Sequence, residues 1–420
     1  MGRSLTSKNS IPLYKKYWYD YWVPHPRRRY LESVIGRALK HSPLVGVLGQ
    51  RQTGKTTLTR RIAGNAYVTL DDAEQLVPAR DAPKAFLKRE RHPFAIDECQ
   101  LAPELFPALK LHVQSHPRKG QFILTGSVRF SARKAIRESL TGRIQLLELH
   151  PMTIAEAQDR DPIDLMDEVS RGFSSFKRKV ENRSASLATE KALAALQAGG
   201  LPGICFYRDI EARRPRFSSH LDTILGRDLK LVSETDHPVI KMREVLAILA
   251  RNQGEPISWS DLARKSRIST ASLQKVVEAF EALFLIRRVL PMGDTRKDAF
   301  FLGDQGVASY LAPSHARQSD LLRLVYSQVF PHLDLHDPGG VTSYRFETRN
   351  GASVPLVFRS AGRTLAILPV ALESPDKKTI GSARSFLRHE PKAQVLVLTE
   401  GSECVEYDDQ LWVLPVTGVL

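Results

Sequence analysis

The chain has 420 residues, of which 42% are hydrophobic and 25% are charged, and its formal net charge is +15. Its length suggests two to four domains, and no apolar run approaches the roughly 18 residues that a membrane-crossing helix needs, which argues against an integral membrane protein. Residues 313–420 hold 11 basic and 12 acidic residues, so the positive excess lies in residues 1–312. A basic body is typical of proteins with a polyanionic partner, such as nucleic acid or an acidic membrane surface, although basic faces also serve solubility alone.

The three cysteines, Cys99, Cys205 and Cys404, lie far apart in the sequence and lack metal-ligand spacing. Their number indicates a reducing compartment, and we expect each to be a small buried hydrophobe. The aromatic stretch 17–23 near the N-terminus is interrupted by an aspartate and has no cleavage-site pattern, so it does not predict a signal peptide. We therefore expect a cytoplasmic protein.

Short apolar runs alternate with helical patterns over the first 150 residues. A helical pattern through residues 31–39 precedes the first run, Leu44–Leu48, whose length and flanks are typical of a buried parallel strand. Four more strands are expected at residues 66–70, 94–96, 121–124 and 146–149. This alternation predicts a parallel sheet with helices on both faces.

A glycine-rich segment follows the first expected strand and precedes a helical pattern. It matches G-x-x-x-x-G-K-[ST], in which backbone N–H groups wrap around phosphate oxygens. Lys55 is expected to reach the β- and γ-phosphates of ATP, and Thr56 to ligate Mg²⁺. The residues expected to hold the nucleotide are Gly49, Gln50, Arg51, Gln52, Thr53, Gly54, Lys55, Thr56 and Thr57. The alternative is a glycine turn with no ligand.

Two acidic residues end the third expected strand, where ligands bind in open α/β sheets. Asp97 is expected to hold Mg²⁺ directly or through water, and Glu98 to orient or deprotonate the attacking water. The alternative for this pair is a helix cap.

Three further segments are candidates for the same site. Residues 125–127 end the fourth strand and could sense the γ-phosphate, or form an ordinary turn. The pair Asp71 and Asp72 also ends a strand, and a loop role is equally consistent with its position. Arg143 could supply a catalytic arginine to its own subunit or to a neighbouring one, or remain solvated.

A helix-turn-helix pattern occupies part of residues 240–310. A first helix is expected over Asp261–Ser266, and a second helix, capped by Ser269 or Thr270, carries an apolar face. The basic residues that could meet DNA phosphates are Arg264, Lys265, Arg267 and Lys275. The alternative, which we favour, is a winged helix used for packing between domains or subunits.

Five motifs in this order resemble the bacterial and archaeal AAA-type ATPases that carry a C-terminal domain of unknown function. They are the glycine-rich loop, Thr69-Leu70-Asp71-Asp72, Ile96-Asp97-Glu98-Cys99-Gln100, Ile123-Leu124-Thr125-Gly126-Ser127 and Glu138-Ser139-Leu140-Thr141-Gly142-Arg143. Weaker matches are Gly199-Gly200-x-Pro202, Arg227-Asp228 and Asp304-Gln305-Gly306. The resemblance implies an AAA+-like core, then a winged helix and a domain like the restriction endonucleases. It implies ATP binding and hydrolysis and leaves the biological target open.

The last domain departs from that family's metal-binding pattern. Ser353-Val354-Pro355 and Ala371-Leu372-Glu373 stand where carboxylates and a lysine are usual in the family. Pro355 and Ala371 offer no metal ligand, and a proline in a strand suits an edge or irregular strand. We expect a nuclease-like fold without nuclease activity.

These observations predict a multidomain α/β protein. The expected parts are a P-loop ATPase domain (1–150), a helical lid-like segment (151–238), a winged-helix domain (239–312) and a restriction-endonuclease-like domain (313–420). The expected function is an ATP-hydrolysing switch or remodelling factor that uses ATP and Mg²⁺. The alternative is a nucleotide-gated module that binds DNA or protein with negligible turnover. A homo-oligomer is possible, and no membrane partner is expected.

Overall fold

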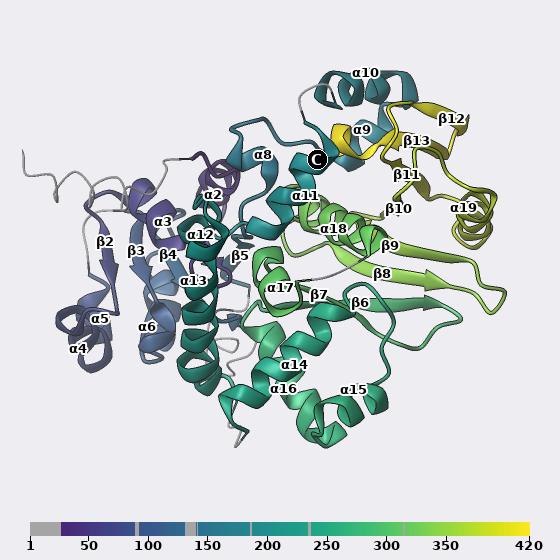
Figure 1. The fold of residues 1–420 in the computed structure, drawn as a ribbon. Helices are drawn as coiled ribbons and strands as arrows, with labels where there is room; N and C mark the ends of the chain where they lie inside the picture. The colour runs from purple at the N-terminus through teal and green to yellow at the C-terminus, as the bar shows by residue number, and fades with distance from the viewer. Residues whose placement is uncertain are drawn as a thin grey trace, which may run out of the picture.

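The computed structural model describes residues 27–88, 92–130, 140, 142–184, 187–233, 237–313 and 316–420. The aromatic stretch 17–23 lies outside the described residues, as do Glu138, Ser139 and Thr141 of the last motif. A smaller sheet built from the N-terminal third and a larger sheet built from the C-terminal third lie at opposite ends of the molecule, with a group of helices between them (Figure 1).

The N-terminal sheet has five strands, and every neighbouring pair is parallel. The strand order is β2-β3-β4-β1-β5. The strands are β1 (Leu44–Leu48), β2 (Tyr67–Thr69), β3 (Phe94–Asp97), β4 (Phe122–Gly126) and β5 (Ile144–Glu148). The predicted parallel sheet is therefore confirmed. All four crossover connections return the chain to the same edge, so the carboxyl ends of the strands lie together.

Helices cover both faces of this sheet. The helices are α2 (Leu31–Leu39), α3 (Lys55–Ala63), α4 (Ala73–Asp81), α5 (Pro83–Phe86), the short η1 (Cys99–Leu101) and α6 (Leu105–Ser115). Alternate residues of β1 point to opposite faces. Val45 and Val47 pack with Ile35 of α2, whereas Leu44 and Leu48 belong to the core that includes α6. Because the side chains of this apolar strand point alternately to opposite faces, β1 is part of the core on each side of the sheet.

The C-terminal sheet has eight strands in the order β12-β13-β11-β10-β9-β8-β6-β7. The strands are β6 (Ile286–Gly293), β7 (Ala299–Leu302), β8 (Thr342–Glu347), β9 (Ser353–Ser360), β10 (Arg363–Val370), β11 (Gln394–Thr399), β12 (Val405–Asp408) and β13 (Leu411–Pro415). Strand β6 pairs in parallel with β8, with Leu290 opposite Tyr344. One sheet therefore contains strands from both sides of the boundary expected at residues 312 and 313.

The remaining helices lie between and around the two sheets. They are α8 (Ile154–Ala157), α9 (Leu165–Ser170), α10 (Phe173–Ser184), α11 (Thr189–Ala198), α12 (Pro202–Cys205), α13 (Ile210–Thr223), the π-helix η3 (Ile224–Asp228), η4 (Leu229–Leu231), α14 (Val239–Arg251), α15 (Trp259–Ser266), α16 (Thr270–Ala282), α17 (Gln305–Leu311), α18 (Arg317–His336), α19 (Lys377–His389) and α20 (Val416–Val419). No helix within these described ranges is long and apolar enough to cross a membrane.

The helices of segment 151–238, which is expected to be lid-like, pack into two different cores. Phe176 and Val180 of α10 share a core with Trp412 of the C-terminal sheet. Phe217 and Leu221 of α13 instead belong to the core that contains α14 and α16. The two halves of this segment are divided because their apolar faces are buried in different cores.

Pro355 lies in β9, which pairs with both β8 and β10 and is therefore not an edge strand. Its pairing is irregular, as the proline suggested. Tyr344 is opposite Val357 and Phe346 is opposite Val354, so two residues of β9 face one residue of β8. This bulge accommodates the missing N–H of Pro355 inside the sheet.

The cysteine expectation is only partly met. Cys99 is fully buried, whereas Cys205 and Cys404 are partly exposed. Cys205 ends the short helix α12, and Cys404 precedes the exposed strand β12, so neither lies in the centre of a core.

Candidate functional site

The glycine-rich loop connects β1 to α3 at the carboxyl edge of the parallel sheet. Gly49 has a φ of 153°, and a Cβ atom there would lie 2.4 Å from the carbonyl oxygen of Leu149. Gly54 adopts a left-handed conformation with a φ of 95° and directly precedes α3. The first N–H groups of α3 are therefore directed at the space above the loop, where they can bind an anion.

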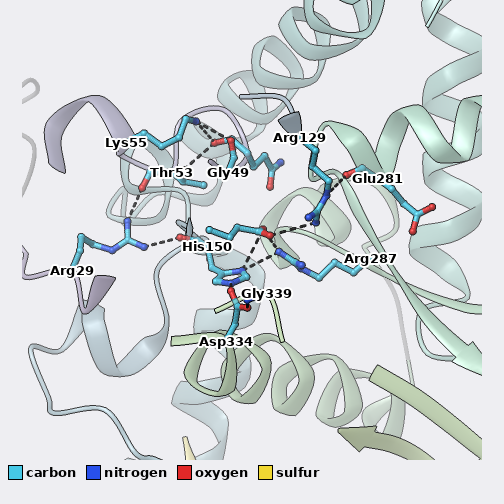
Figure 2. A network of polar contacts seen from close by, with 12 residues as sticks. Arg29, Gly49, Thr53, Lys55, Arg129, His150, Glu281, Arg287, Asp334 and Gly339 are labelled. Carbon is cyan, nitrogen blue, oxygen red and sulfur yellow. Dashed lines mark hydrogen bonds and ion pairs between the residues drawn. The ribbon is translucent and has the colours of Figure 1, made fainter. Parts of the chain in front are cut away.

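Lys55 begins α3, and its side chain folds back over the loop (Figure 2). Nζ donates hydrogen bonds to the carbonyl oxygens of Gly49 and Gln50, both at 2.9 Å. Burial lowers the pKa of the Lys55 ammonium, and the carboxylates of Glu98 and Asp97 oppose this effect. The ammonium is thus held at the loop.

The two predicted metal ligands lie in contact. Thr56 Oγ1 donates to Asp97 Oδ2 at 2.7 Å, and Asp97 is only 2% exposed. Tyr67 donates its hydroxyl to the same oxygen at 2.7 Å, and Thr125 donates to Oδ1. Sequence reasoning missed Tyr67, although its place on the neighbouring strand was the available signal.

Glu98 follows Asp97 in a left-handed conformation with a φ of 53°. Its carboxylate accepts a hydrogen bond from Gln100, whose Nε2 also lies 3.4 Å from Ser127 Oγ. Burial raises the pKa of the Glu98 carboxyl, and Lys55 opposes this effect. A carboxyl with a raised pKa is a better proton acceptor once ionised, as a general base requires.

A helical segment far away in the sequence lies over the loop. His220 of α13 bridges Gln50 and Gln52, with Nδ1 donating to Gln52 Oε1 at 3.0 Å and Nε2 accepting from Gln50 at 3.1 Å. Arg51 pairs with Asp228 of η3 at 3.5 Å. Sequence reasoning gave His220 no role, because a single histidine in a polar helix carries no local signal.

A second ion pair joins η3 to the site. Arg227 donates to Asp71 at 3.1 Å. Both residues are about half exposed, so the pair itself contributes little to stability. The sequence analysis named Asp71 only as a residue at the end of a strand. The structure places it beside η3, which contains Arg227-Asp228, one of the weaker matches to the AAA-type family.

Arg29 connects the loop to the end of β5. Its guanidinium donates to the carbonyl oxygens of Thr53 and His150, both at 2.6 Å (Figure 2). It also pairs with Glu156 at 3.1 Å. Arg29 is 7% exposed. Each of its three nitrogens therefore has an acceptor, and the guanidinium connects the loop to the end of β5 and to α8.

Arg143 lies at the opposite end of the strands from the loop, where β1 and β5 begin. It immediately precedes β5, whose first residue, Ile144, pairs with Leu44 at the start of β1. The loop begins five residues later, about 16 Å further along the strand. The structure therefore does not bring Arg143 together with the loop of its own chain, and a catalytic role for it, in its own or in a neighbouring subunit, stays a prediction.

The lowered pKa values of two buried histidines lead to a prediction of how the free energy of unfolding depends on pH. Burial, with the charges of Arg51 and Lys55, lowers the pKa of His220 to about 4, and burial lowers the pKa of His332 to about 4. Both side chains are nearly inaccessible to solvent. A histidine in the unfolded chain takes up a proton near pH 6.5. The contribution of each neutral buried histidine to the free energy of unfolding is therefore fully present above that pH. It is lost as the pH falls towards 4, by up to about 3 kcal/mol for each residue.

The test is urea unfolding at pH 7.5 and pH 5.0. Nε2 of His332 has no hydrogen-bond partner among the described residues, so His332→Leu removes the titration without breaking a bond at that atom. We expect the loss of stability between the two pH values to be about 2 kcal/mol smaller in this variant. Equal losses in the wild type and the variant would show that His332 is not held neutral.

Comparisons with known proteins match this geometry. Residues 41–158 match a family model described as an AAA domain, and residues 189–317 match one described as a domain of unknown function (DUF8612). The uncharacterised protein Rv2008c of Mycobacterium tuberculosis is 27% identical over 266 residues, which cover 63% of this chain and 53% of that protein. The uncharacterised protein MJ1637 of Methanocaldococcus jannaschii is 26% identical over 282 residues, 60% of this chain and 58% of that protein. The chain thus matches little more than half the length of these relatives.

Among solved structures, the Walker-type ATPase PABY2304 of Pyrococcus abyssi aligns with a TM-score of 0.37 and 17% identity, over 68% of this chain and 95% of that one. So low a TM-score carries no weight beside the family match. Residues 41–158, which are similar to an AAA domain, contain the glycine-rich loop and all five strands of the parallel sheet.

Proposed function

We propose that residues 49–57 bind ATP together with Mg²⁺ and that the chain hydrolyses ATP. The observation that carries this proposal is the 2.7 Å contact between Thr56 Oγ1 and Asp97 Oδ2, which brings a loop hydroxyl and a strand carboxylate to one point. Such a pair holds Mg²⁺ in P-loop ATPases, where the ion neutralises charge on the phosphates. Mg²⁺ prefers oxygen ligands and few protein ligands, so these two residues fit it.

Lys55 supplies the positive charge for the phosphates. It exchanges the carbonyl oxygens of Gly49 and Gln50 for phosphate oxygens when ATP occupies the loop. Because the ammonium is already desolvated, a charged phosphate is a better partner for it than two neutral carbonyl groups.

Glu98 is the proposed general base or water-positioning residue. It is adjacent to Asp97 and close enough to Lys55 for their charges to interact. Replacing Glu98 with glutamine is expected to lower kcat by about 100-fold or more, because the amide accepts no proton. Affinity for ATP should change little, which calorimetry and phosphate release measure together; an unchanged kcat would remove Glu98 from the mechanism.

The proposed switch is the contact between the loop and the helices α13 and η3. Three consecutive loop residues, Gln50, Arg51 and Gln52, are bonded to His220 and Asp228. A phosphate that draws Arg51 away from Asp228 leaves a buried carboxylate without its partner, which favours movement of η3. A π-helix at this position is typical of functional sites.

We retain the alternative of a nucleotide-gated module that binds DNA or protein with negligible turnover. The segment that would make such a contact is a winged helix, which we propose is formed by α14, α15, α16 and the β6–β7 hairpin. Ser269 caps α16, as the sequence suggested. Arg264 is exposed but pairs with Asp261 of its own helix, and α16 is buried against α14, which favours packing over DNA contact.

Steady-state phosphate release with and without DNA separates these functions. Stimulation by DNA, with an affinity that falls as salt rises, would support phosphate contacts by the winged helix. Turnover near zero in both conditions, with tight ATP binding, would support the alternative.

We also propose that residues 313–420 have a nuclease-like fold without nuclease activity. Mg²⁺-dependent DNA cleavage that is lost in Glu373→Gln would contradict this.

A further inference from the structure

A cavity of about 370 Å³ lies between the AAA-type domain and the C-terminal sheet. Its lining includes Gln158 and Ala194, which are exposed, and Leu302 and Asp304, which are buried. The exposed pair comes from the region of α8 and α11 and marks the mouth, whereas the buried pair belongs to the turn between β7 and α17 and forms the floor. A volume of this size is within the range of small-molecule sites.

The wall of the cavity is largely apolar. Met152, Leu196, Phe206 and Phe330 are among the residues that line it. Several polar groups in the wall are already bonded within the protein, since Asp304 accepts hydrogen bonds from the backbone N–H groups of Gly200 at 2.7 Å and Val307 at 2.9 Å. A polar ligand would meet few unused partners there, so the wall favours a molecule that is mainly apolar.

Arg287 is the exception in this wall. It belongs to a buried network in which Nη2 donates to Glu148 and to His150 Nδ1, and His150 Nε2 contacts Asp334 at 2.7 Å (Figure 2). Within the described residues, the hydrogen bonds of its guanidinium all use Nη2, which leaves Nε and Nη1 as donors. The guanidinium is also held in place over the ring of Phe330, 4.6 Å from its centroid.

The charge of the wall favours an anion. Arg213 is a second guanidinium in the lining, and Asp304 is the only carboxylate among the described lining residues. The Asp304 carboxylate is already bonded to the backbone N–H groups of Gly200 and Val307, which offset its charge. Glu148 and Asp334 balance the network behind the wall but do not line the cavity.

We propose that this cavity binds a small, mainly apolar anion, such as an aromatic carboxylate or sulfonate, whose acidic group pairs with Arg287. The site is separate from the phosphate loop, because none of residues 49–57 lines it. It borders the loop at two places: a Cβ on Gly303 would lie 3.1 Å from Gln50 Oε1, and the carbonyl of His150 is bonded to Arg29. The proposal does not depend on ATP hydrolysis.

The test uses two fluorescent probes with the same aromatic framework. 8-Anilinonaphthalene-1-sulfonate carries an anionic group, and N-phenyl-1-naphthylamine lacks it. We expect the full-length protein to bind one equivalent of the sulfonate at least about tenfold more tightly than the neutral probe, because a charge-assisted hydrogen bond to Arg287 is lost with the latter. Equal affinities would overturn the assigned ligand class.

Cavity-filling variants locate the site. Ala195→Phe on α11 and Ala157→Phe on α8 fill the cavity from different walls, so a folding defect in one leaves the other as the test. Gln197→Phe is the matched control, because Gln197 is exposed on α11 and does not line the cavity. We expect at least tenfold weaker sulfonate binding in the folded cavity variants and wild-type binding in the control; unchanged binding in the cavity variants would overturn the site.

A titration against Mg²⁺ and ATP distinguishes the cavity from the nucleotide site. Separate sites predict that the apparent Kd of the probe stays constant or reaches a plateau as nucleotide is added. A Kd that rises in proportion to nucleotide without limit would show direct competition and would overturn the proposal.

Discussion

Replacing Lys55 with alanine is expected to lower the rate of ATP hydrolysis by a factor on the order of 100 to 1000, as the loss of one preorganised charge at a reacting phosphate does in other enzymes. The ammonium is buried at the loop and is the only loop side chain that bonds two of its carbonyl oxygens among the described residues. Steady-state phosphate release measures the effect.

The control for this variant is Lys84→Ala. Lys84 is an exposed residue of α5 and has no part in the site. It should hydrolyse ATP at the wild-type rate. If Lys55→Ala retained that rate as well, the phosphate loop would not be the place where hydrolysis occurs.

Arg29→Ala is expected to reduce the free energy of unfolding by about 3–5 kcal/mol. The variant removes donors to Thr53 and His150 and leaves the carboxylate of Glu156 without its arginine. The side chains of both partners are less than a tenth exposed, and breaking a buried pair by removing one partner is costly because a buried charge is left uncompensated.

The neighbouring residue provides a matched control. Arg28 pairs with Asp161 at 3.6 Å, but its side chain is 62% exposed and that of Asp161 is 90% exposed. Arg28→Ala should change stability by less than about 0.5 kcal/mol. Urea unfolding of the two variants measures the difference, and similar losses in both would show that Arg29 does not brace the loop.

The backbone of the glycine-rich loop was predictable because its requirements are local. Gly49 and Gly54 adopt backbone conformations that favour glycine, and Lys55 and Thr56 follow them within two residues. Asp97 was predictable because a parallel strand ends at the edge where the loop lies. These residues needed only the strand pattern to be assigned.

Other parts of the site depend on contacts that no local pattern encodes. His220 lies 170 residues from Gln50, and a histidine in a polar helix looks the same whether it is solvated or buried. Arg143 followed a suggestive motif, but the register of β5 against β1 determines which edge of the sheet it occupies. A motif identifies a candidate residue, but the pairing of the strands determines at which end of the sheet that residue lies.

Strand pairing across the expected boundary at residues 312 and 313 also depends on contacts that no local pattern encodes. The helix-turn-helix pattern predicts two helices, and α15 and α16 lie there, yet β6 pairs with β8 from beyond the expected boundary. Strand pairing is determined by which edges remain available after folding, and composition does not record this.

The central claim is that Thr56 and Asp97 hold one Mg²⁺ ion beside the phosphates. Its most direct test is the affinity of a non-hydrolysable ATP analogue for the wild type and for Asp97→Asn, measured by calorimetry with and without Mg²⁺. We expect Mg²⁺ to tighten binding to the wild type by about tenfold or more, and to have little effect on the variant. Binding that is indifferent to Mg²⁺ in the wild type, or equally dependent on it in Asp97→Asn, would contradict the account.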